Sequence, residues 1–377
     1  MIINQQPIIW IFKGDKYGDF LQMENVAKAL GFNYFIKELP LNYYKPISLF
    51  KNNGIKQKIS LNMKLLTKIL IPPWPDLVLA SGKHGAVAAM IVKTLSLKTK
   101  LVHIGRPWCN ISNFDLIITT PQYGLADAHN VILNPLTLNI INPKKIDEDI
   151  IKWRRSIPFE GPYLTVLLGG NSKPLIFTKK NAIELSSMIN KIAYGLGYKV
   201  LISSSRRTPV EIVDLLIKNL QVPFYLHRWQ EKTQNPYFCF LGLADLIICT
   251  NDSASMISEI CSLKKEVLIY SLENGYFLLN HIQKILHRTY NNLKDKNQIV
   301  KRFLFFYQHL LNLGIYQLRD MDFFIDNLKE KGLIKIIRQQ SLQDIIDNKK
   351  IALKQNNFDN YFNASISKIK NLLTNSE

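Results

Sequence analysis

The feature that most constrains the fold is the alternation of short apolar runs with longer amphipathic stretches along the chain. Runs such as Leu77–Ala80 and Leu246–Cys249 lack polar alternation, which is typical of strands buried on both faces. The stretches between such runs, for example Lys179–Tyr194, have the spacing of a helix with one apolar face. Buried strands joined by helices predict an α/β fold built on parallel sheets.

This rhythm occurs twice, which is consistent with a chain of 377 residues, too long for one ordinary domain. The region Asn142–Gly161 interrupts the rhythm with prolines and charged residues, and its sequence indicates a link between domains. After Leu272 the pattern becomes helical, with helices expected at Phe303–Leu313 and Phe323–Lys331. We therefore expect two Rossmann-like, doubly wound domains facing a cleft, residues 1–150 and 151–340, and a helical C-terminal extension, residues 341–377.

The strands and helices expected in the two domains can be placed individually. Predicted strands are Ile8–Phe12, Tyr34–Ile36, Leu77–Ala80, Leu101–Ile104, Leu116–Thr119, Tyr163–Leu168, Lys199–Ile202, Leu246–Cys249 and Val267–Ile269. A helix is expected to end at Gly31, and others to follow Pro209 and to span Ala254–Cys261.

The net charge of +19, from 48 Lys and Arg against 29 Asp and Glu, favours anionic ligands or an anionic membrane surface. An alternative is that the charge is only compositional, because lysine, asparagine and isoleucine are abundant throughout. Nucleic acid is an unlikely partner, since the charge is spread out and is not interleaved with aromatic residues.

Targeting and cysteine usage favour a cytoplasmic protein. Four cysteines without CxxC spacing indicate buried thiols in a reducing compartment. The N-terminus has no signal-peptide pattern, and no run approaches the roughly 20 apolar residues of a membrane span. The sequence therefore predicts a cytoplasmic or peripheral protein.

Ligands of open parallel sheets bind beyond the carboxyl ends of the strands, so the loops there are candidate sites. The first such loop in the second domain is Gly169-Gly170-Asn171-Ser172-Lys173. Its glycines permit positive φ and close approach of the backbone, while the serine and lysine add a donor and a charge, so it is a candidate phosphate cradle. An ordinary turn after a strand is the alternative.

Two further loops of the second domain have the same position after a strand. In one, hydroxyls, two guanidinium groups and a helix N-terminus form a candidate anion site; in the other, hydroxyls and amides at a helix N-terminus can hold phosphate. Glu259 can accept from ribose or sugar hydroxyls. The alternatives are a solvated helix cap for the first loop and a plain N-cap at Asp252 or Ser253 for the second. The candidate residues are Ser204, Ser205, Arg206, Arg207 and Thr208, followed by Asn251, Asp252, Ser253, Ser255, Met256 and Glu259.

The first domain has two comparable loops. One contains Lys16, Gly18 and Asp19, where the aspartate is a candidate general base or simply a helix N-cap. The other is Ser81-Gly82-Lys83-His84, whose histidine either shuttles protons or faces solvent at a helix start. His103 ends a buried strand and is expected to be structural.

Several catalytic motifs are absent from the sequence. It contains no GxxxxGK[ST], no GxGxxG after a strand, no GxSxG and no HExxH. A dinucleotide oxidoreductase is therefore disfavoured, and a mechanism without a metal or a cofactor is expected.

The candidate loops and their spacing resemble the mitochondrial-fission ELM family and its bacterial homologues. The resemblance covers roughly residues 8 to 270 and rests on these segments: Pro75–Val78 with Ala80–Gly82, Phe114–Leu116, Gly161-Pro162, Leu167–Lys173, Ser204–Pro209, Asn235–Tyr237, Phe240-Leu241, Ala244-Asp245 and Asp252–Glu259. Members usually carry Asp-Gly-Lys-x-Gly-His in the first loop, whereas this chain has Asp19 at the histidine position.

That family is similar to GT-B glycosyltransferases, including the peripheral-membrane enzyme that adds N-acetylglucosamine in peptidoglycan precursor synthesis. The resemblance implies a nucleotide-diphosphate sugar as donor in the second domain and an acceptor on the first, next to Lys16, Gly18, Ser81, Gly82 and Lys83. Sugar transfer would be inverting and metal-independent, with Asp19 as the catalytic residue. The alternative is a non-catalytic adaptor acting in division or membrane organisation.

Two finer expectations follow from the sequence. If the acceptor is lipid-linked, the lysine-rich and apolar segment Lys45–Lys68 is the expected contact with an anionic membrane. Arg206 and Arg207 are adjacent and cannot both reach one phosphate without strain, so one is expected to bind ligand and the other to brace the loop.

Overall fold

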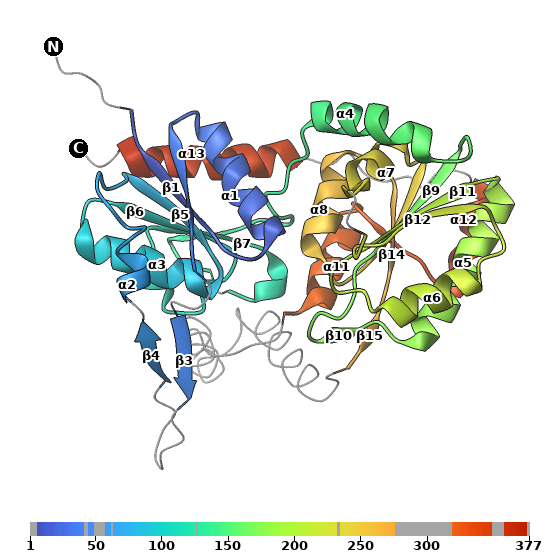
Figure 1. The fold of residues 1–377 in the computed structure, drawn as a ribbon, viewed down its shortest axis with the longest axis horizontal. Coiled ribbons are helices and arrows are strands. Elements are labelled where there is room, and N and C mark those ends of the chain that lie inside the picture. The colour runs from blue at the N-terminus through green and yellow to red at the C-terminus, as the bar shows by residue number, and fades with distance from the viewer. Residues whose placement is uncertain are drawn as a thin grey trace, which may run out of the picture. The chain divides into compact units, whose positions relative to one another are not determined.

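The computed structural model describes residues 6–40, 44–48, 57–61, 63–125, 127–231, 234–275, 319–348 and 358–374. Between residues 44 and 64 only the course of the main chain is described. The chain forms two compact units, each with its own six-stranded parallel sheet (Figure 1). The expectation of two Rossmann-like doubly wound units is confirmed.

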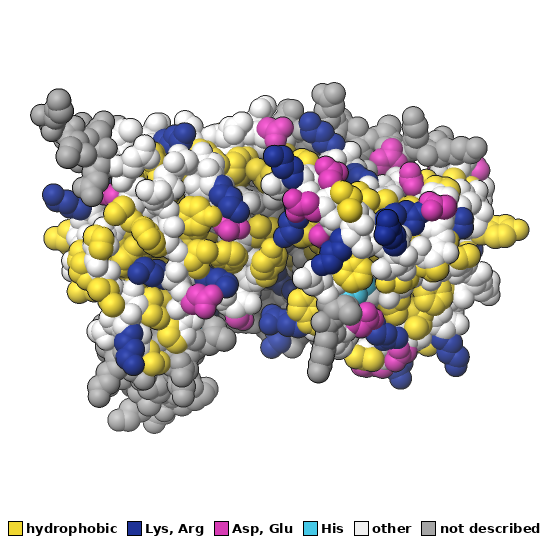
Figure 2. Space-filling view, turned by 45° about the horizontal axis from the view of Figure 1, so that its top comes forward, with side chains coloured by type: hydrophobic (Ala, Val, Ile, Leu, Met, Phe, Trp, Pro, Cys, Tyr) yellow, Lys and Arg dark blue, Asp and Glu magenta, His cyan; other side chains and the backbone are white. Residues whose placement is uncertain are grey.

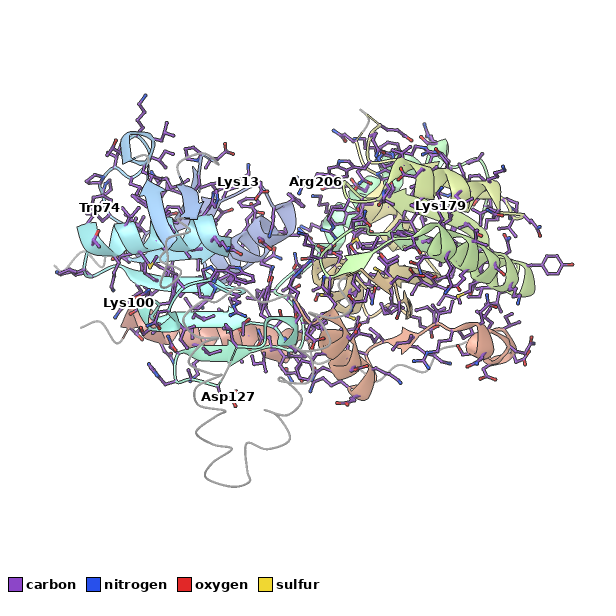
Figure 3. The ribbon with its side chains drawn as sticks, turned by 90° about the horizontal axis from the view of Figure 1, so that it is seen from below. Lys13, Trp74, Lys100, Asp127, Lys179 and Arg206 are labelled. Atoms are coloured by element: carbon purple, nitrogen blue, oxygen red, sulfur yellow. The ribbon has the colours of Figure 1, made fainter. Side chains whose placement is uncertain are left out.

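In the first unit the strand order is β2-β1-β5-β6-β7-β8. The strands are β1 (Ile9–Lys13), β2 (Tyr34–Glu38), β5 (Leu77–Ser81), β6 (Lys100–Ile104), β7 (Leu116–Thr119) and β8 (Val131–Leu133). Their parallel direction is visible in Figure 3, where Lys13 at the end of β1 lies at the opposite end of the unit from Lys100 at the start of β6. All candidate loops of this unit therefore lie at one edge of its sheet.

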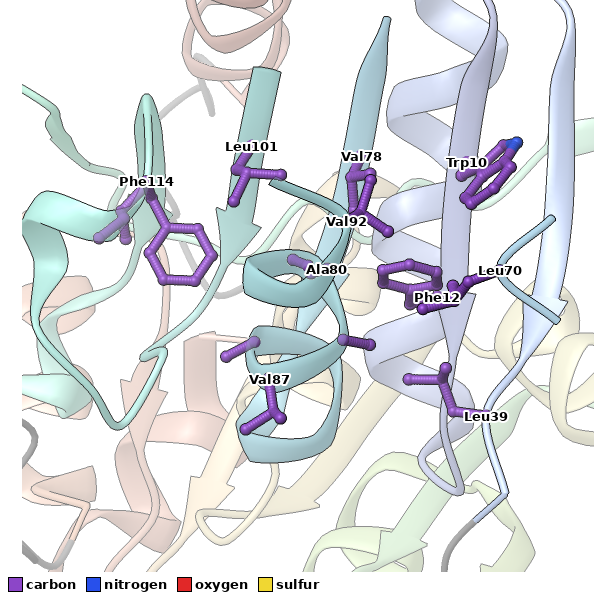
Figure 4. Packing of buried hydrophobic residues seen from close by; sticks show 14 of the residues in the cluster. Trp10, Phe12, Leu39, Leu70, Val78, Ala80, Val87, Val92, Leu101 and Phe114 are labelled. Carbon is purple, nitrogen blue, oxygen red and sulfur yellow. The ribbon is translucent and has the colours of Figure 1, made fainter. Parts of the chain in front are cut away.

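Helices cover both faces of this sheet (Figure 1). Helices α2 (Met63–Leu66) and α3 (Gly82–Leu95) lie on one side, and α1 (Tyr17–Leu30) and α13 (Phe358–Thr374) on the other. On the α3 side, Trp10, Phe12 and Val78 from the sheet pack against Val92 of the helix in a continuous apolar core (Figure 4). Helix α1 ends, as expected, at Gly31, whose φ of 78° suits glycine.

Helix α13 comes from the far end of the chain but completes the first unit. Ile369 is fully buried, and the side chain of Asn134 donates to Ser365 Oγ at 2.9 Å. The interval 341–377 expected as one extension is thus divided, because α12 (Leu342–Asn348) belongs to the second unit.

In the second unit the strand order is β12-β11-β9-β13-β14-β16. The strands are β9 (Tyr163–Leu168), β11 (Lys199–Ser204), β12 (Phe224–His227), β13 (Leu246–Thr250), β14 (Val267–Tyr270) and β16 (Lys335–Ile336). The helices are α4 (Pro143–Trp153), α5 (Lys179–Leu196), α6 (Val210–Lys218), α7 (Tyr237–Leu243), α8 (Ala254–Ser262), α11 (Met321–Glu330) and α12.

Short elements complete the described chain. Two antiparallel pairs join β3 (Tyr44–Ser48) to β4 (Gln57–Leu61) and β10 (Leu175–Ile176) to β15 (Glu273–Asn274). The single turns of 3₁₀ helix are η1 (Ile111–Asn113), η2 (Pro121–Tyr123), η3 (Arg154–Ser156) and η4 (Gln339–Ser341).

The segment expected as a link, Asn142–Gly161, is instead largely packed structure. Asn142 caps helix α4 by accepting from the Lys144 N–H at 3.0 Å, and Pro143 occupies the first turn. The helix packs on α7 so closely that a Cβ at Gly242 would lie 2.4 Å from Ile146. The second compact unit accordingly begins at Ile140, eleven residues before the expected start at residue 151.

Other expectations fall partly outside the described residues. The helix expected at 323–331 is confirmed as α11, whereas the one expected at 303–313 lies outside them. Most side chains of Lys45–Lys68 also lie outside them, so the membrane-contact hypothesis stays a prediction. On the face shown in Figure 2, basic side chains are scattered among acidic and apolar ones.

Candidate functional site

The candidate site lies at the point where the second sheet reverses its strand order. From β9 the chain proceeds to β11 and β12 on one side, and then crosses to β13 and β14 on the other. The carboxyl ends of β9 and β13 are therefore adjacent, and helices run away from them on opposite faces. Such a switch point is the usual ligand position in an open α/β sheet. The loops predicted from sequence, Gly169–Lys173 and Asn251–Ser253, begin at these two strand ends.

Asp252 is the centre of the contacts at this switch point. Its carboxylate, which is fully buried, accepts from the Gly170 N–H at 3.0 Å and from the Thr250 hydroxyl at 2.7 Å. The Arg207 guanidinium completes the set with an ion pair at 2.6 Å. A buried charge is stable only when it is paired and hydrogen-bonded, and these three donors meet that requirement. Asp252 therefore fastens the loop after β9 to the loop after β11.

The two glycines of the first loop are required by this close packing. A Cβ at Gly169 would lie 1.8 Å from Asp252 Oδ1, and one at Gly170 would lie 2.1 Å from the Arg207 carbonyl oxygen. Neither glycine is among those with positive φ. The sequence argument was thus correct about close approach of the backbone, but positive φ is not the reason for these glycines.

The main-chain N–H groups of this loop are already used within the domain. Gly169 donates to Thr250 Oγ1, Gly170 to Asp252, Asn171 to the Arg207 carbonyl and Ser172 to the Leu175 carbonyl, at 2.8–3.1 Å. In a phosphate cradle these N–H groups would face the ligand, whereas here the buried carboxylate of Asp252 accepts from one of them. This corrects the expectation of a main-chain phosphate cradle, since a phosphate would have to displace Asp252 to reach these groups.

The side chains of the loop are also largely engaged. Asn171 accepts from the Phe177 N–H at 2.9 Å, and the Ser172 hydroxyl accepts from Arg319. Lys173 is exposed and is the cation this loop presents to solvent.

The hydroxyls of the loop after β11 hold the strand ends together. Ser205 donates to the Gly169 carbonyl at 2.9 Å, and Thr208 donates to the Leu168 carbonyl at 3.0 Å. Ser204 accepts from the Trp229 N–H at 3.0 Å. Each of these three residues, singled out as a ligand contact, thus makes a hydrogen bond that holds this edge of the sheet together, and the ligand contacts stay a prediction.

Arg206 and Arg207 have different environments, as expected. Arg207 is the bracing arginine, because it pairs with buried Asp252. Arg206 is exposed at the surface of the unit (Figure 3), and within the described part of the chain it makes no hydrogen bond or ion pair. Arg206 is thus available to an anionic ligand.

Helix α8 begins at the end of β13. Ser253 caps it by accepting from the Met256 N–H at 3.4 Å, and Asn251 accepts from the Leu272 N–H at 3.0 Å. Among the described residues nothing accepts from the N–H groups of Ala254 and Ser255. These two donors and the positive end of the helix dipole favour an anion there.

Glu259 lies inside helix α8, where burial raises the pKa of its carboxyl group from an ordinary 4.5 to about 7. The Tyr237 hydroxyl donates to Glu259 Oε2 at 2.6 Å, and this bond and the Lys145 ammonium oppose the rise. Lys145 also lies 4.5 Å from the centre of the Phe238 ring, so α4, α7 and α8 meet at this carboxyl group. A carboxyl near its pKa at neutral pH can accept from, or donate to, a ligand hydroxyl.

The first unit has a corresponding switch point between β1 and β5. Lys16 precedes helix α1, Gly18 and Asp19 lie in its first turn, and Ser81 and Gly82 lead from β5 into α3. All of these residues, and Lys83, are at the same edge, so the structure brings the expected acceptor-side residues together within the unit. Gly18 accepts from the Asn139 side chain at 3.2 Å, which fixes the start of α1.

The histidine at the end of β6 has a structural role, as expected. His103 is fully buried, with its two ring nitrogens each 3.3 Å from a carbonyl oxygen, of Gly82 and of Gly105. Burial lowers the pKa of His103 to about 4, so the ring is neutral and links the loops after β5 and β6. Lys83 lies 5.3 Å from the centre of the Trp108 ring on the second of these loops.

Sequence reasoning missed strands β8, β12 and β16 of the two main sheets, and with β12 it missed Trp229. Strand β12, Phe224–His227, is only four residues long, and Trp229 comes two residues after it at the carboxyl edge of the second sheet. Pro223 before an aromatic and apolar run was an available signal.

Metal binding, disulfide formation and membrane crossing concern the described residues as a whole. No group of three or more His, Cys, Asp or Glu side chains in them could hold a metal ion. No disulfide joins the four cysteines, all of which are described, and those on β13 and α8 are buried. No helix of the described chain is long and apolar enough to cross a membrane.

Two parallel sheets with flanking helices and a final helix that returns to the first define the GT-B class of fold. UDP-GlcNAc 2-epimerase from Methanocaldococcus jannaschii is similar in fold and aligns with a TM-score of 0.56 and 14% identity over 97% of this chain and 99% of its own. A second structure of that epimerase, in complex with UDP-GlcNAc and UDP, aligns with a TM-score of 0.50 and 13% identity over 97% and 99% of the two chains.

The chain belongs to the mitochondrial fission ELM1 family, whose sequence model matches residues 18–303. An uncharacterized protein of Rickettsia prowazekii is 27% identical over 326 residues, which are 75% of this chain and 90% of the relative. The mitochondrial fission protein ELM1 of Arabidopsis thaliana is 22% identical over 255 residues, 59% of each protein. The resemblance found in the sequence is thereby confirmed.

Proposed function

We propose that the second unit binds a nucleoside diphosphate sugar at the β9–β13 switch point. The observation that carries the proposal is the donor set there: within the described part of the chain, the N–H groups of Ala254 and Ser255 at the start of α8 have no acceptor, and the nearby Arg206 side chain is exposed. A diphosphate suits these groups, because charge-assisted hydrogen bonds contribute about 1.5–3 kcal/mol each. Lys173 adds a second cation.

In this proposal Glu259 binds the ribose. Its other oxygen, Oε1, would accept from a ribose hydroxyl, while Tyr237 holds Oε2. Asp252 and Arg207 do not touch the ligand and hold the two loops in place. The nucleotide complexes of the M. jannaschii epimerase show that this fold accommodates UDP-GlcNAc, which supports the choice of ligand class.

The proposed reaction is inverting transfer of the sugar to an acceptor hydroxyl on the first unit. The hydroxyl oxygen would attack the anomeric carbon, the bond to the diphosphate would break, and Asp19 would take the hydroxyl proton. Asp19 lies in the first turn of α1, half-buried, next to Lys16 and Gly18. A lipid-linked or envelope acceptor at the membrane surface would suit the net charge of +19.

A second candidate function is a non-catalytic adaptor in division or membrane organisation. Two observations favour it: Asp19 replaces the histidine of the family pattern, and Asp252 occupies the loop donors that a phosphate would otherwise use. Arg206→Ala and Glu259→Gln separate the functions, because an adaptor would keep its partner binding and an enzyme would lose donor binding.

Thermal shift with UDP-, GDP- and dTDP-sugars near millimolar concentration tests the proposal. We expect at least one to raise the melting temperature of the wild type and to do so less for Arg206→Ala. Lys218→Ala is the matched control, because Lys218 is also exposed but lies at the last turn of α6, at the other edge of the sheet. No shift with any nucleotide sugar would argue for the adaptor.

A further inference from the structure

We infer that Trp229 is the stacking platform for the nucleobase, an inference that rests on the proposed nucleotide site. Trp229 follows β12 at the carboxyl edge of the second sheet and leaves 49% of its surface exposed. Burial of a large aromatic side chain is strongly favourable, so a half-exposed tryptophan beside a ligand site calls for a partner. A nucleobase offers such a partner, because every base has an aromatic face.

The turn that carries Trp229 is fixed by contacts on several sides. The Arg228 N–H donates to Glu231 Oε1 and the Glu231 N–H donates to the Arg228 carbonyl, both at 3.0 Å. Arg228 also pairs with Asp214 on α6 at 2.6 Å, and Glu231 lies 3.3 Å from the buried His227. The indole is therefore presented on a rigid base, which reduces the entropy lost when a ligand stacks on it.

The position of this turn agrees with a base that extends from the proposed ribose site. At one end, the main-chain N–H of Trp229 donates to Ser204 Oγ at 3.0 Å, which fastens the main chain at Trp229 to the end of β11, two residues before Arg206. At the other end, the segment after the turn enters α7 at Tyr237, whose hydroxyl donates to Glu259 at 2.6 Å. The end of β12, which Trp229 follows, and the start of α7, where Tyr237 holds the proposed ribose carboxyl group, thus both lie at the carboxyl edge of the second sheet.

Among the described residues, the second unit has one other strongly exposed aromatic side chain, and it provides a control. Tyr194 is 87% exposed in the last turn of α5, at the opposite edge of the sheet. Trp229→Ala removes the platform, Trp229→Phe keeps an aromatic face, and Tyr194→Ala removes exposed aromatic surface far from the site.

The test is titration of each variant with UDP, GDP and dTDP, and with inorganic pyrophosphate, followed by calorimetry. For every nucleotide that binds the wild type, we expect Trp229→Ala to weaken binding about 5- to 100-fold and Trp229→Phe by much less. Tyr194→Ala should bind like the wild type, and pyrophosphate affinity should not change in any variant. Melting curves check that each variant is folded.

Two failures are distinguishable. If the wild type binds nucleotides and Trp229→Ala binds them equally well, or loses pyrophosphate to the same extent, Trp229 is not the platform and the nucleotide site stands. If the wild type binds no nucleotide at all, the proposed function is overturned together with this inference.

Discussion

Replacing Arg207 by alanine should destabilise the second unit, although Arg207 is largely a surface residue. The guanidinium is the only full positive charge on the carboxylate of Asp252, which is fully buried, among the contacts of the described chain. Its loss leaves a buried charge with two neutral donors, the Gly170 N–H and the Thr250 hydroxyl. Arg206→Ala is the matched control, since Arg206 is its exposed neighbour without such a pair.

The magnitude can be worked from the exposure of the pair. Removing one partner of a buried ion pair costs about 3–5 kcal/mol. The Arg207 side chain is 39% exposed, so water partly replaces it, and we halve the cost to about 2 kcal/mol. For a domain of this size that lowers the melting temperature by about 4–8 °C. Arg206→Ala should stay within about 0.5 kcal/mol of the wild type.

Urea unfolding and thermal melting of Arg207→Ala, alone and combined with Asp252→Asn, provide the assay. The asparagine removes the buried charge, so in that background Arg207→Ala should cost less than about 0.5 kcal/mol. The reasoning is refuted if Arg207→Ala costs the same in both backgrounds, or if Arg206→Ala lowers stability as much.

Three more predictions follow from the described contacts. Gly170→Ala should lower the free energy of unfolding in urea by about 3 kcal/mol, because its Cβ would lie 2.1 Å from the Arg207 carbonyl oxygen. Gly14→Ala, whose Cβ would have nothing within 4 Å, should lower it little, and similar losses in the two variants would contradict the packing argument. The free energy of unfolding should fall by about 3 kcal/mol as pH rises from 4.5 to 7, because the Glu259 carboxyl group keeps its proton in the folded protein over this range and loses it in the unfolded chain. Glu259→Gln should abolish this fall, and an unchanged fall in that variant would show that another group causes it. Ile369→Ala should lower the free energy of unfolding by about 2–5 kcal/mol if α13 completes the first core, whereas Lys368→Ala, at an exposed position, should change it very little. An equally small effect of both variants would show that α13 is not part of this core.

The sequence by itself determined the elements whose signals are local. The strands expected at 77–80, 163–168 and 246–249 are present, because an apolar run buried on both faces needs no knowledge of its neighbours. Gly31 ends its helix for an equally local reason. The family resemblance lies largely in the loops that directly follow these strands.

Weak local signals were missed or misinterpreted. Strand β12 is short, and helix α4 was taken for a link because its prolines and charges suggest a loop. Asn142-Pro143 is in fact a cap followed by a first-turn proline, which is a helix start.

Only the tertiary structure decided the chemistry of the candidate site. In the sequence, Asp252 looks like a helix cap or a phosphate contact. In the structure it pairs with Arg207, 45 positions away, and it accepts from the Gly170 N–H, a donor that was expected to bind phosphate. Likewise, α13 returns to the first unit through Asn134, 231 positions before Ser365. Periodicity reports which face of a segment is buried, whereas strand order decides which strand ends meet, and partners so distant in sequence are set by that order.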